Sequence, residues 1–266
     1  MNRYHRLNGQ MLTRAILLVA GVTLLTLPVG TVNAADRGLQ LNQTRVIFNA
    51  KAKNATTTIK NHSDRVYLVK ANVMATLDPS AAKKGTVDST VPFMVTPPLF
   101  RLEPNSQSTV LVVRDGTAEL PTDRESVFYL SLLAIPSTSK STEERNAGVS
   151  AQVSVGIQTI IKLFYRPEGL SIPVQYAPKK LTFRQVGQNL QVGNPTPYFV
   201  TLAKLTLNGK SMDVRDAEAG AMIAPFSTQN YPITGQAQQA TWTVINDYGG
   251  ESAEYHAAVS SVKEPS

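Results

Sequence analysis

The sequence predicts an all-β protein built from two β-sandwiches. After residue 35, apolar and polar residues alternate with a period of two over most of the chain, which is the pattern of half-buried strands. Clusters of Asn, Asp, Pro and Gly separate these short runs at intervals of about 8–12 residues, as in sandwich folds. No segment has a convincing helical period, and the best candidate, residues 213–220, is too short. The chain has 266 residues, 42% of them hydrophobic, which is enough for two separate cores.

Residues 1–34 are predicted to form a signal peptide. Basic residues precede an apolar run from Ala15 to Leu27, and small residues follow it up to Ala34. The run is shorter than the roughly 20 residues that a membrane-spanning helix needs. We therefore expect cleavage after Ala34, export to a bacterial periplasm, and no stable membrane insertion of the mature chain.

Residues 35–166 are predicted to form the first sandwich. Segment 127–135 (VFYLSLLAI) is almost continuously apolar, which indicates a strand buried on both faces. The polar stretch 137–148 is expected to be a loop. The other strands expected here are residues 44–48, 55–60, 66–73, 109–113 and 149–165.

Residues 173–266 are predicted to form the second sandwich. Pro and Gly cluster between residues 166 and 178, and a new series of strands begins at Leu181. Each half has the size of an immunoglobulin domain. The expected strands are residues 181–186, 190–192, 199–207, 239–245 and 253–262.

The composition excludes most catalytic and metal-binding functions. The chain has no Cys and three His, so it has no thiolate ligands and little material for a His-based site. It also lacks a P-loop, a G-x-S-x-G elbow and an H-E-x-x-H helix motif. The net charge of +7 includes three arginines of the signal peptide, and the mild remainder does not indicate nucleic-acid binding. We expect no catalytic residues, no metal and no cofactor.

One segment is unusual for a sandwich strand, because residues 149–165 run far beyond the usual length of about five or six residues. Its second half is apolar on both faces except at Lys162. One interpretation is a strand whose projecting half is donated to a partner protein. The other is a long edge strand that packs on its own second sheet. The alternating aliphatic residues of the first half are Val149, Ala151, Val153, Val155 and Ile157.

Two cations stand beside apolar runs. Lys162 lies between Ile161 and Leu163, and Arg45 begins the apolar run of the first expected strand. A buried cation needs an anion or a route to water. Together the two could hold a carboxylate, although for either residue taken singly the sequence favours a side chain that reaches solvent at a strand end.

Several motifs resemble those of PapD-like periplasmic pilus chaperones of the chaperone–usher system. The resemblance spans nearly the whole mature chain. The matching stretches are TRVIF at 44–48, TPP at 96–98, FRLEP at 100–104, RESVFYL at 124–130, IKLFYRP at 161–167, NPTPY at 194–198 and LNG at 207–209. Ser131 departs from the pattern, because the family often has Asn there.

The resemblance implies two immunoglobulin-like domains in a boomerang arrangement and a function without catalysis. It implies that Arg45 and Lys162 anchor the C-terminal carboxylate of a pilus or fimbrial subunit. It also implies that residues 149–157 lend the subunit a strand, before transfer to an outer-membrane usher. Self-association remains open when no subunit is present. The alternative is a secreted surface or fibre subunit, but the long strand here is internal and a second domain follows it.

Overall fold

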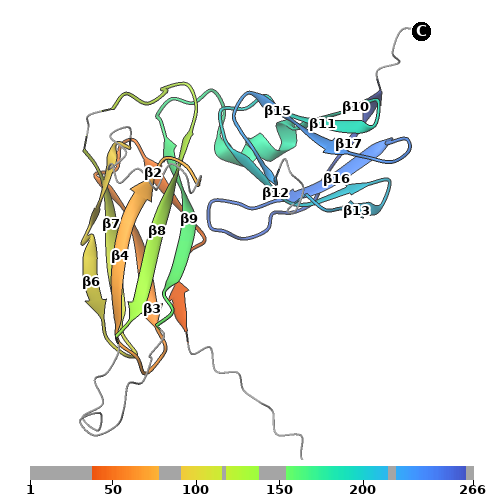
Figure 1. The fold of residues 1–266 in the computed structure, drawn as a ribbon. Coiled ribbons are helices and arrows are strands. Elements are labelled where there is room, and N and C mark those ends of the chain that lie inside the picture. Colours follow the sequence, from red (N-terminus) through yellow and green to blue (C-terminus); the bar gives the residue numbers. More distant parts are fainter. Residues whose placement is uncertain (1–37, 78–90, 116–117, 138–153, 215–219, 262–266) are drawn as a thin grey trace, which may run out of the picture. The chain divides into compact units, whose positions relative to one another are not determined.

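The computed structural model has two groups of strands, drawn as a ribbon in Figure 1. Each has its own hydrophobic cluster, one drawn from residues 46–165 and the other from residues 177–244. The structure describes residues 38–77, 91–115, 118–137, 154–214 and 220–261. Nearly all elements in these ranges are strands, which confirms the all-β prediction. The expected signal peptide, most of the expected loop at 137–148, and Val149, Ala151 and Val153 lie outside the described residues.

The first sandwich consists of two sheets. Side chains at alternate positions of their strands are buried between the sheets, as the period-two pattern requires. One sheet has the order β1 (Leu39–Leu41), β3 (Asn54–Asn61), β7 (Gln107–Arg114), β5 (Phe93–Thr96). The other has the order β2 (Arg45–Asn49), β9 (Ile157–Arg166), β8 (Ser126–Pro136), β4 (Tyr67–Met74), β6 (Leu99–Leu102).

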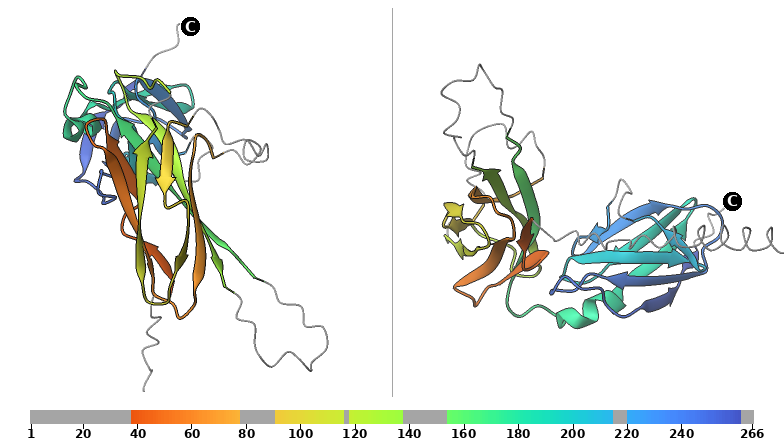
Figure 2. Two further views of the ribbon diagram at one scale, coloured as in Figure 1. Left: turned by 90° about the vertical axis from the view of Figure 1, so that its left-hand side faces the viewer. Right: turned by 90° about the horizontal axis from the view of Figure 1, so that it is seen from below.

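The second sandwich follows a short 3₁₀ helix, η1 (Val174–Lys180), and has its own core around Trp242. Two further views show its strands in Figure 2. One sheet has the order β15 (Ser227–Pro232), β11 (Asn189–Asn194), β10 (Thr182–Val186), β18 (Ser260–Ser261). The other has the order β13 (Lys210–Met212), β12 (Val200–Leu207), β16 (Gln239–Val244), β17 (Tyr255–Ala258), with β14 (Met222–Ile223) also paired to β12.

The structure corrects three expectations. The long strand begins at Ile157 rather than at residue 149, because the described residues before Ile157 have no ladder partner. The helix η1 was not expected, because a helix of seven residues that contains Pro178 is too short to show a helical pattern of apolar residues in the sequence. Where a single strand was expected at residues 253–262, the structure has the two strands β17 and β18, because the chain crosses between sheets at Val259: β17 pairs with β16, and β18 pairs with β10.

One end of β9 is in the core and the other is exposed, so truncating an aliphatic side chain to Ala should lower the free energy of unfolding by very different amounts at the two ends. Leu163 is fully buried, whereas Ile157, on the same face of the same strand, is 47% exposed. Leu163→Ala should lower the free energy of unfolding by about 2–5 kcal/mol through lost burial and a residual cavity. Ile157→Ala should change it by no more than about 0.5 kcal/mol. Urea denaturation of the two variants measures both effects, and equal losses would mean that β9 is in the core along its whole length.

Candidate functional site

The structure brings Arg45 and Lys162 together. β2 pairs in parallel with the C-terminal half of β9, and in this register Arg45 lies beside Lys162. The pairing begins at these two residues and continues to Asn49 and Arg166. Two residues that are far apart in the sequence therefore form one local concentration of positive charge.

Burial makes this pair of cations energetically unfavourable. Burial lowers the pKa of Lys162, and the neighbouring charge of Arg45 lowers it further. Burial also lowers the pKa of Arg45, against a weaker opposing effect of Asp247 and Glu125. No carboxylate forms a salt bridge with either cation within the part of the chain that the structure describes. Two neighbouring cations are thus half-buried here without a carboxylate at salt-bridge distance among the described residues.

The side chain of Arg45 is held in place by neutral groups. Its Nη1 donates a hydrogen bond to the carbonyl oxygen of Ile245 at 3.2 Å. Its guanidinium carbon lies 5.9 Å from the centre of the Phe164 ring. These contacts orient the guanidinium without neutralising it, so its charge remains available to a ligand.

On the N-terminal side of Lys162, β9 has a neighbouring strand along only one of its two edges among the described residues, which leaves the other edge open. β8 pairs with β9 along its whole length from Ile157, but β2 joins the other edge only from Lys162 onward. Residues 157–160 are exposed, and no described strand covers their second edge. Along one face, the side chains change from 47% exposed at Ile157 to 8% exposed at Ile161. This edge offers unpaired main-chain groups of the kind that recruit a further strand.

Two of the aliphatic residues predicted to be donated are described by the structure. Val155 is 70% exposed and Ile157 is also exposed. The other three, Val149, Ala151 and Val153, precede the described residues. The two that are described present apolar surface that this chain does not cover.

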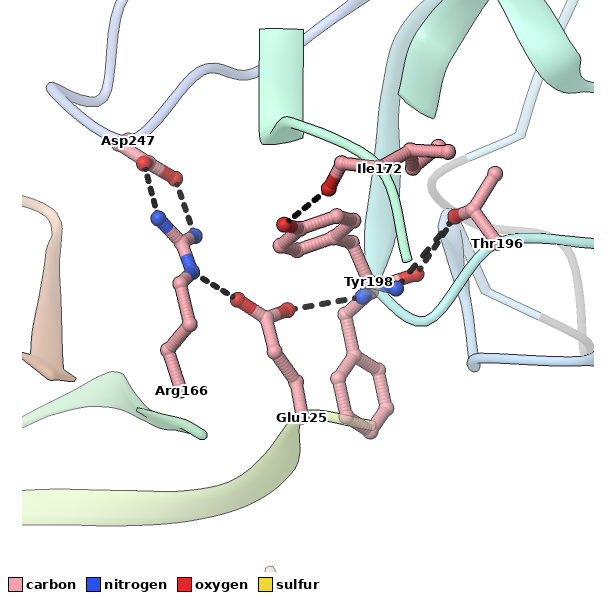
Figure 3. Close-up of polar contacts among 7 residues, drawn as sticks. Glu125, Arg166, Ile172, Thr196, Tyr198 and Asp247 are labelled. Carbon is pink, nitrogen blue, oxygen red and sulfur yellow. Dashed lines mark hydrogen bonds and ion pairs between the residues drawn. The ribbon is translucent and has the colours of Figure 1, made fainter. Parts of the chain in front are cut away.

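Sequence reasoning missed a second charged group, centred on Arg166 (Figure 3). Arg166 Nε donates to Glu125 Oε1 at 2.7 Å, and its Nη1 and Nη2 donate to the two carboxylate oxygens of Asp247 at 2.7 and 2.9 Å. The other oxygen of Glu125 accepts the amide hydrogen of Phe199 at 2.9 Å. The three charged residues come from both sandwiches and join β9, the start of β8 and the loop after β16.

The charged side chains of this group are paired with one another, whereas Arg45 and Lys162 have no carboxylate partner among the described residues. Burial raises the pKa of Glu125, although Arg166 and the Phe199 amide oppose that shift. Burial alone would lower the pKa of Arg166, but hydrogen bonding to Asp247 and the charge of Glu125 raise it above its ordinary value. The sequence gives only one hint of this network, an acidic residue placed directly before an apolar strand.

No three His, Cys, Asp or Glu side chains in the described ranges come close enough together to bind a metal ion. None of the helices in those ranges has the length and apolarity to cross a membrane.

Comparison with protein families gives two matches that together span most of the chain. Residues 38–171 match the family described as "Pili and flagellar-assembly chaperone, PapD N-terminal domain". Residues 176–256 match "Pili assembly chaperone PapD, C-terminal domain".

Individual relatives agree with these matches. The probable fimbrial chaperone protein ElfD of Escherichia coli O157:H7 is 33% identical over 91% of this chain and 96% of its own length. The chaperone protein FimB/FhaD of Bordetella pertussis is 35% identical over 85% of this chain and 90% of its own length.

Solved structures are similar as well. The E. coli chaperone DraB superposes with a TM-score of 0.69 at 33% identity, covering 84% of this chain and 96% of that one. A chain of the complex between the Salmonella enterica SafA pilin and the SafB chaperone gives a TM-score of 0.67 at 32% identity. That match covers 83% of this chain and 96% of the other.

The lowered pKa of Lys162 predicts that removing its charge stabilises the free protein. The unfolded chain binds a proton at Lys162 more tightly than the folded chain does, so this contribution to stability rises with pH toward 10.5, the ordinary value. Lys162→Met should therefore be more stable than the wild type at neutral pH, and the difference should shrink as the pH approaches that value. Urea denaturation at pH 7 and pH 10 measures it. Lys70→Met, at an exposed position of β4, is the control, and a destabilised Lys162→Met would contradict the prediction.

Burial predicts that two Arg–Glu pairs of similar length differ in importance. Arg166 and Glu125 are 2.7 Å apart with the Glu125 side chain 2% exposed, whereas Arg101 and Glu103 are 2.6 Å apart with that of Glu103 54% exposed. Arg166→Ala should cost about 3–5 kcal/mol, because it leaves a carboxylate buried without its partner. Arg101→Ala should cost about 1 kcal/mol or less. Similar losses in thermal or urea denaturation would show that burial does not decide the strength of these pairs.

Proposed function

The chain belongs to the PapD family of pilus assembly chaperones, and we propose that it captures pilus subunits with the Arg45–Lys162 pair and the open edge of β9. Its two sandwiches are the immunoglobulin-like domains of that family, as the motifs predicted. The observation that carries the proposal is the pairing of two half-buried cations at the point where the open edge of β9 ends.

The ligand of the cation pair is a carboxylate at the end of a chain. A terminal carboxylate offers two oxygens, one of which can accept from the Arg45 guanidinium while the other accepts from the Lys162 ammonium. Neutralising the two charges removes the penalty that burial imposes on them. A side-chain carboxylate could do the same, but only a terminus also allows the preceding residues to lie along β9.

The direction of the captured strand follows from this placement. β9 runs from Ile157 toward Lys162, and the cations lie at the C-terminal end of its open edge. A strand with its C-terminal carboxylate at Lys162, and its preceding residues beside Ile157–Ile161, must run parallel to β9. It therefore continues the line of β2, which is also parallel to β9.

The alternating aliphatic residues supply the second part of the interaction. Val155 and Ile157, together with Val149, Ala151 and Val153, would fill the apolar groove that an incomplete subunit sandwich leaves open. Main-chain hydrogen bonds and the carboxylate anchor fix the register, so that the same residues always enter the groove. The chaperone thereby covers surface that would otherwise cause the subunit to aggregate.

The rest of the cycle follows from the family. We place the mature chain in the periplasm after cleavage near Ala34, and propose that it delivers its subunit to an outer-membrane usher. The mechanism is an exchange of strands without a bond being made or broken, so it uses no catalytic residue, metal or cofactor. A fibre subunit is the less favoured assignment, because the donor segment here is internal.

Co-purification from the periplasm tests the proposal, using tagged chaperone and the product of any pilin-like gene that neighbours its own. The wild type should yield a stoichiometric complex. Arg45→Ala and Lys162→Ala should each lose the complex, since the remaining cation cannot hold the carboxylate alone. Val155→Asp should weaken it strongly, because a charge would enter the apolar groove.

Two controls separate these effects from misfolding. Ser154→Asp places the same charge on the neighbouring residue, whose side chain points to the other face of a bound strand, and should leave capture nearly intact. Each variant should also retain the wild-type circular dichroism spectrum. Normal yield with Lys162→Ala would refute the anchor, and normal yield with Val155→Asp would refute the donor strand.

A further inference from the structure

Two buried side-chain atoms in the described part of the chain have no hydrogen-bond partner. They are Nε of Arg45 and Oγ1 of Thr201. Thr201 is 8% exposed, so water does not readily satisfy its hydroxyl. A buried polar group without a partner is destabilising, and such groups are rare enough in native proteins to require an explanation. A shared ligand explains both, provided that the two atoms lie in the same place.

The backbone of Ile245 brings the two residues close to each other. Ile245 N donates to the carbonyl oxygen of Thr201 at 2.9 Å, and Ile245 O accepts from Nη1 of Arg45 at 3.2 Å. The amide and carbonyl of one extended residue point to the same side of its strand. The Arg45 guanidinium is therefore close to the backbone of Thr201, although the two residues come from different sandwiches.

The side chain of Thr201 also lies on the face that Arg45 occupies. Val200 and Leu202, its neighbours in β12, are in the core of the second sandwich, so Thr201 points away from that core. Phe199 shares this outward face, and its ring centre is 5.6 Å from that of Phe164. Arg45 lies over the same Phe164 ring. The outward face of β12 therefore lies beside the Arg45–Lys162 pair.

We propose that the Thr201 hydroxyl is a third donor of the anion site, and that it hydrogen-bonds a carboxylate oxygen of the captured subunit's C-terminus. This assignment rests on the proposed function. Arg45 Nε and Lys162 Nζ supply charge, and Thr201 adds a neutral donor from the other sandwich. A subunit bound in this way contacts both sandwiches through a single carboxylate.

Two substitutions separate a ligand-binding role from a packing role. Thr201→Val removes the hydroxyl and keeps the shape, whereas Thr201→Ser keeps the hydroxyl. The probe is a peptide that copies the C-terminal strand of the pilin subunit that co-purifies with the chaperone, made with a free carboxylate and as the amide. Isothermal titration measures the affinity of each variant for each peptide.

Thr201→Val should bind the free-carboxylate peptide at least about tenfold more weakly than the wild type, the loss expected for one hydrogen bond to a charged group. Thr201→Ser should remain within about twofold of the wild type. With the amidated peptide, Thr201→Val and the wild type should be equally weak. Without peptide, Thr201→Val should unfold at a higher urea concentration, because an unsatisfied buried hydroxyl has been removed.

The contrary results are distinguishable. If Thr201→Val binds the free-carboxylate peptide as tightly as the wild type, Thr201 is not a donor, while the anchor itself stands. If Thr201→Val is less stable without peptide, the hydroxyl has a structural partner and the assignment is wrong. If the wild type binds both peptides equally, the carboxylate anchor of the proposed function fails as well.

Discussion

The parallel pairing of β2 with the C-terminal half of β9 is the constraint on which the other features of the site depend. It places Arg45 beside Lys162, and by stopping there it leaves the edge of residues 157–161 without a partner. The same pairing ends at Arg166, where β9 meets carboxylates from β8 and from the loop after β16. A shift of one residue in this register would separate the two cations and turn every side chain of β2 to its other face.

Lys162 and Arg166 show how differently the fold treats two cations of one strand. They are four residues apart and share a face of β9, yet Arg166 has two carboxylate partners and Lys162 has none among the described residues. The chain thus neutralises one cation completely while it leaves the neighbouring pair unfavourably buried. A protein selected only for stability would not keep such a pair. In the proposed function, a ligand from outside would bring the missing negative charge.

The sequence was sufficient for the architecture and for part of the site. The period of two predicted the sandwich strands, and the apolar flanks of Lys162 marked it as a buried cation. The N-terminal end of β9 was not predictable, because strand formation requires a neighbour and alternation continues where no neighbour exists. The contacts among Glu125, Arg166 and Asp247 were not predictable either, since their proximity depends on register and on loop geometry. The split between β17 and β18 was missed for a similar reason, because the sequence does not record which sheet a segment joins.

The arrangement of the site also indicates how subunits are favoured over a second copy of the chaperone. Two chaperones could pair along the open edges of β9 and cover Val155 and Ile157 on each. Such a pair would bring no terminal carboxylate to Arg45 and Lys162, and the unpartnered atoms of Arg45 and Thr201 would stay unsatisfied. In the proposed function, a subunit would satisfy the strand edge, the apolar residues and the cations with one continuous segment. Apolar burial would then be common to both partners, and the carboxylate at the end of the strand would distinguish the subunit.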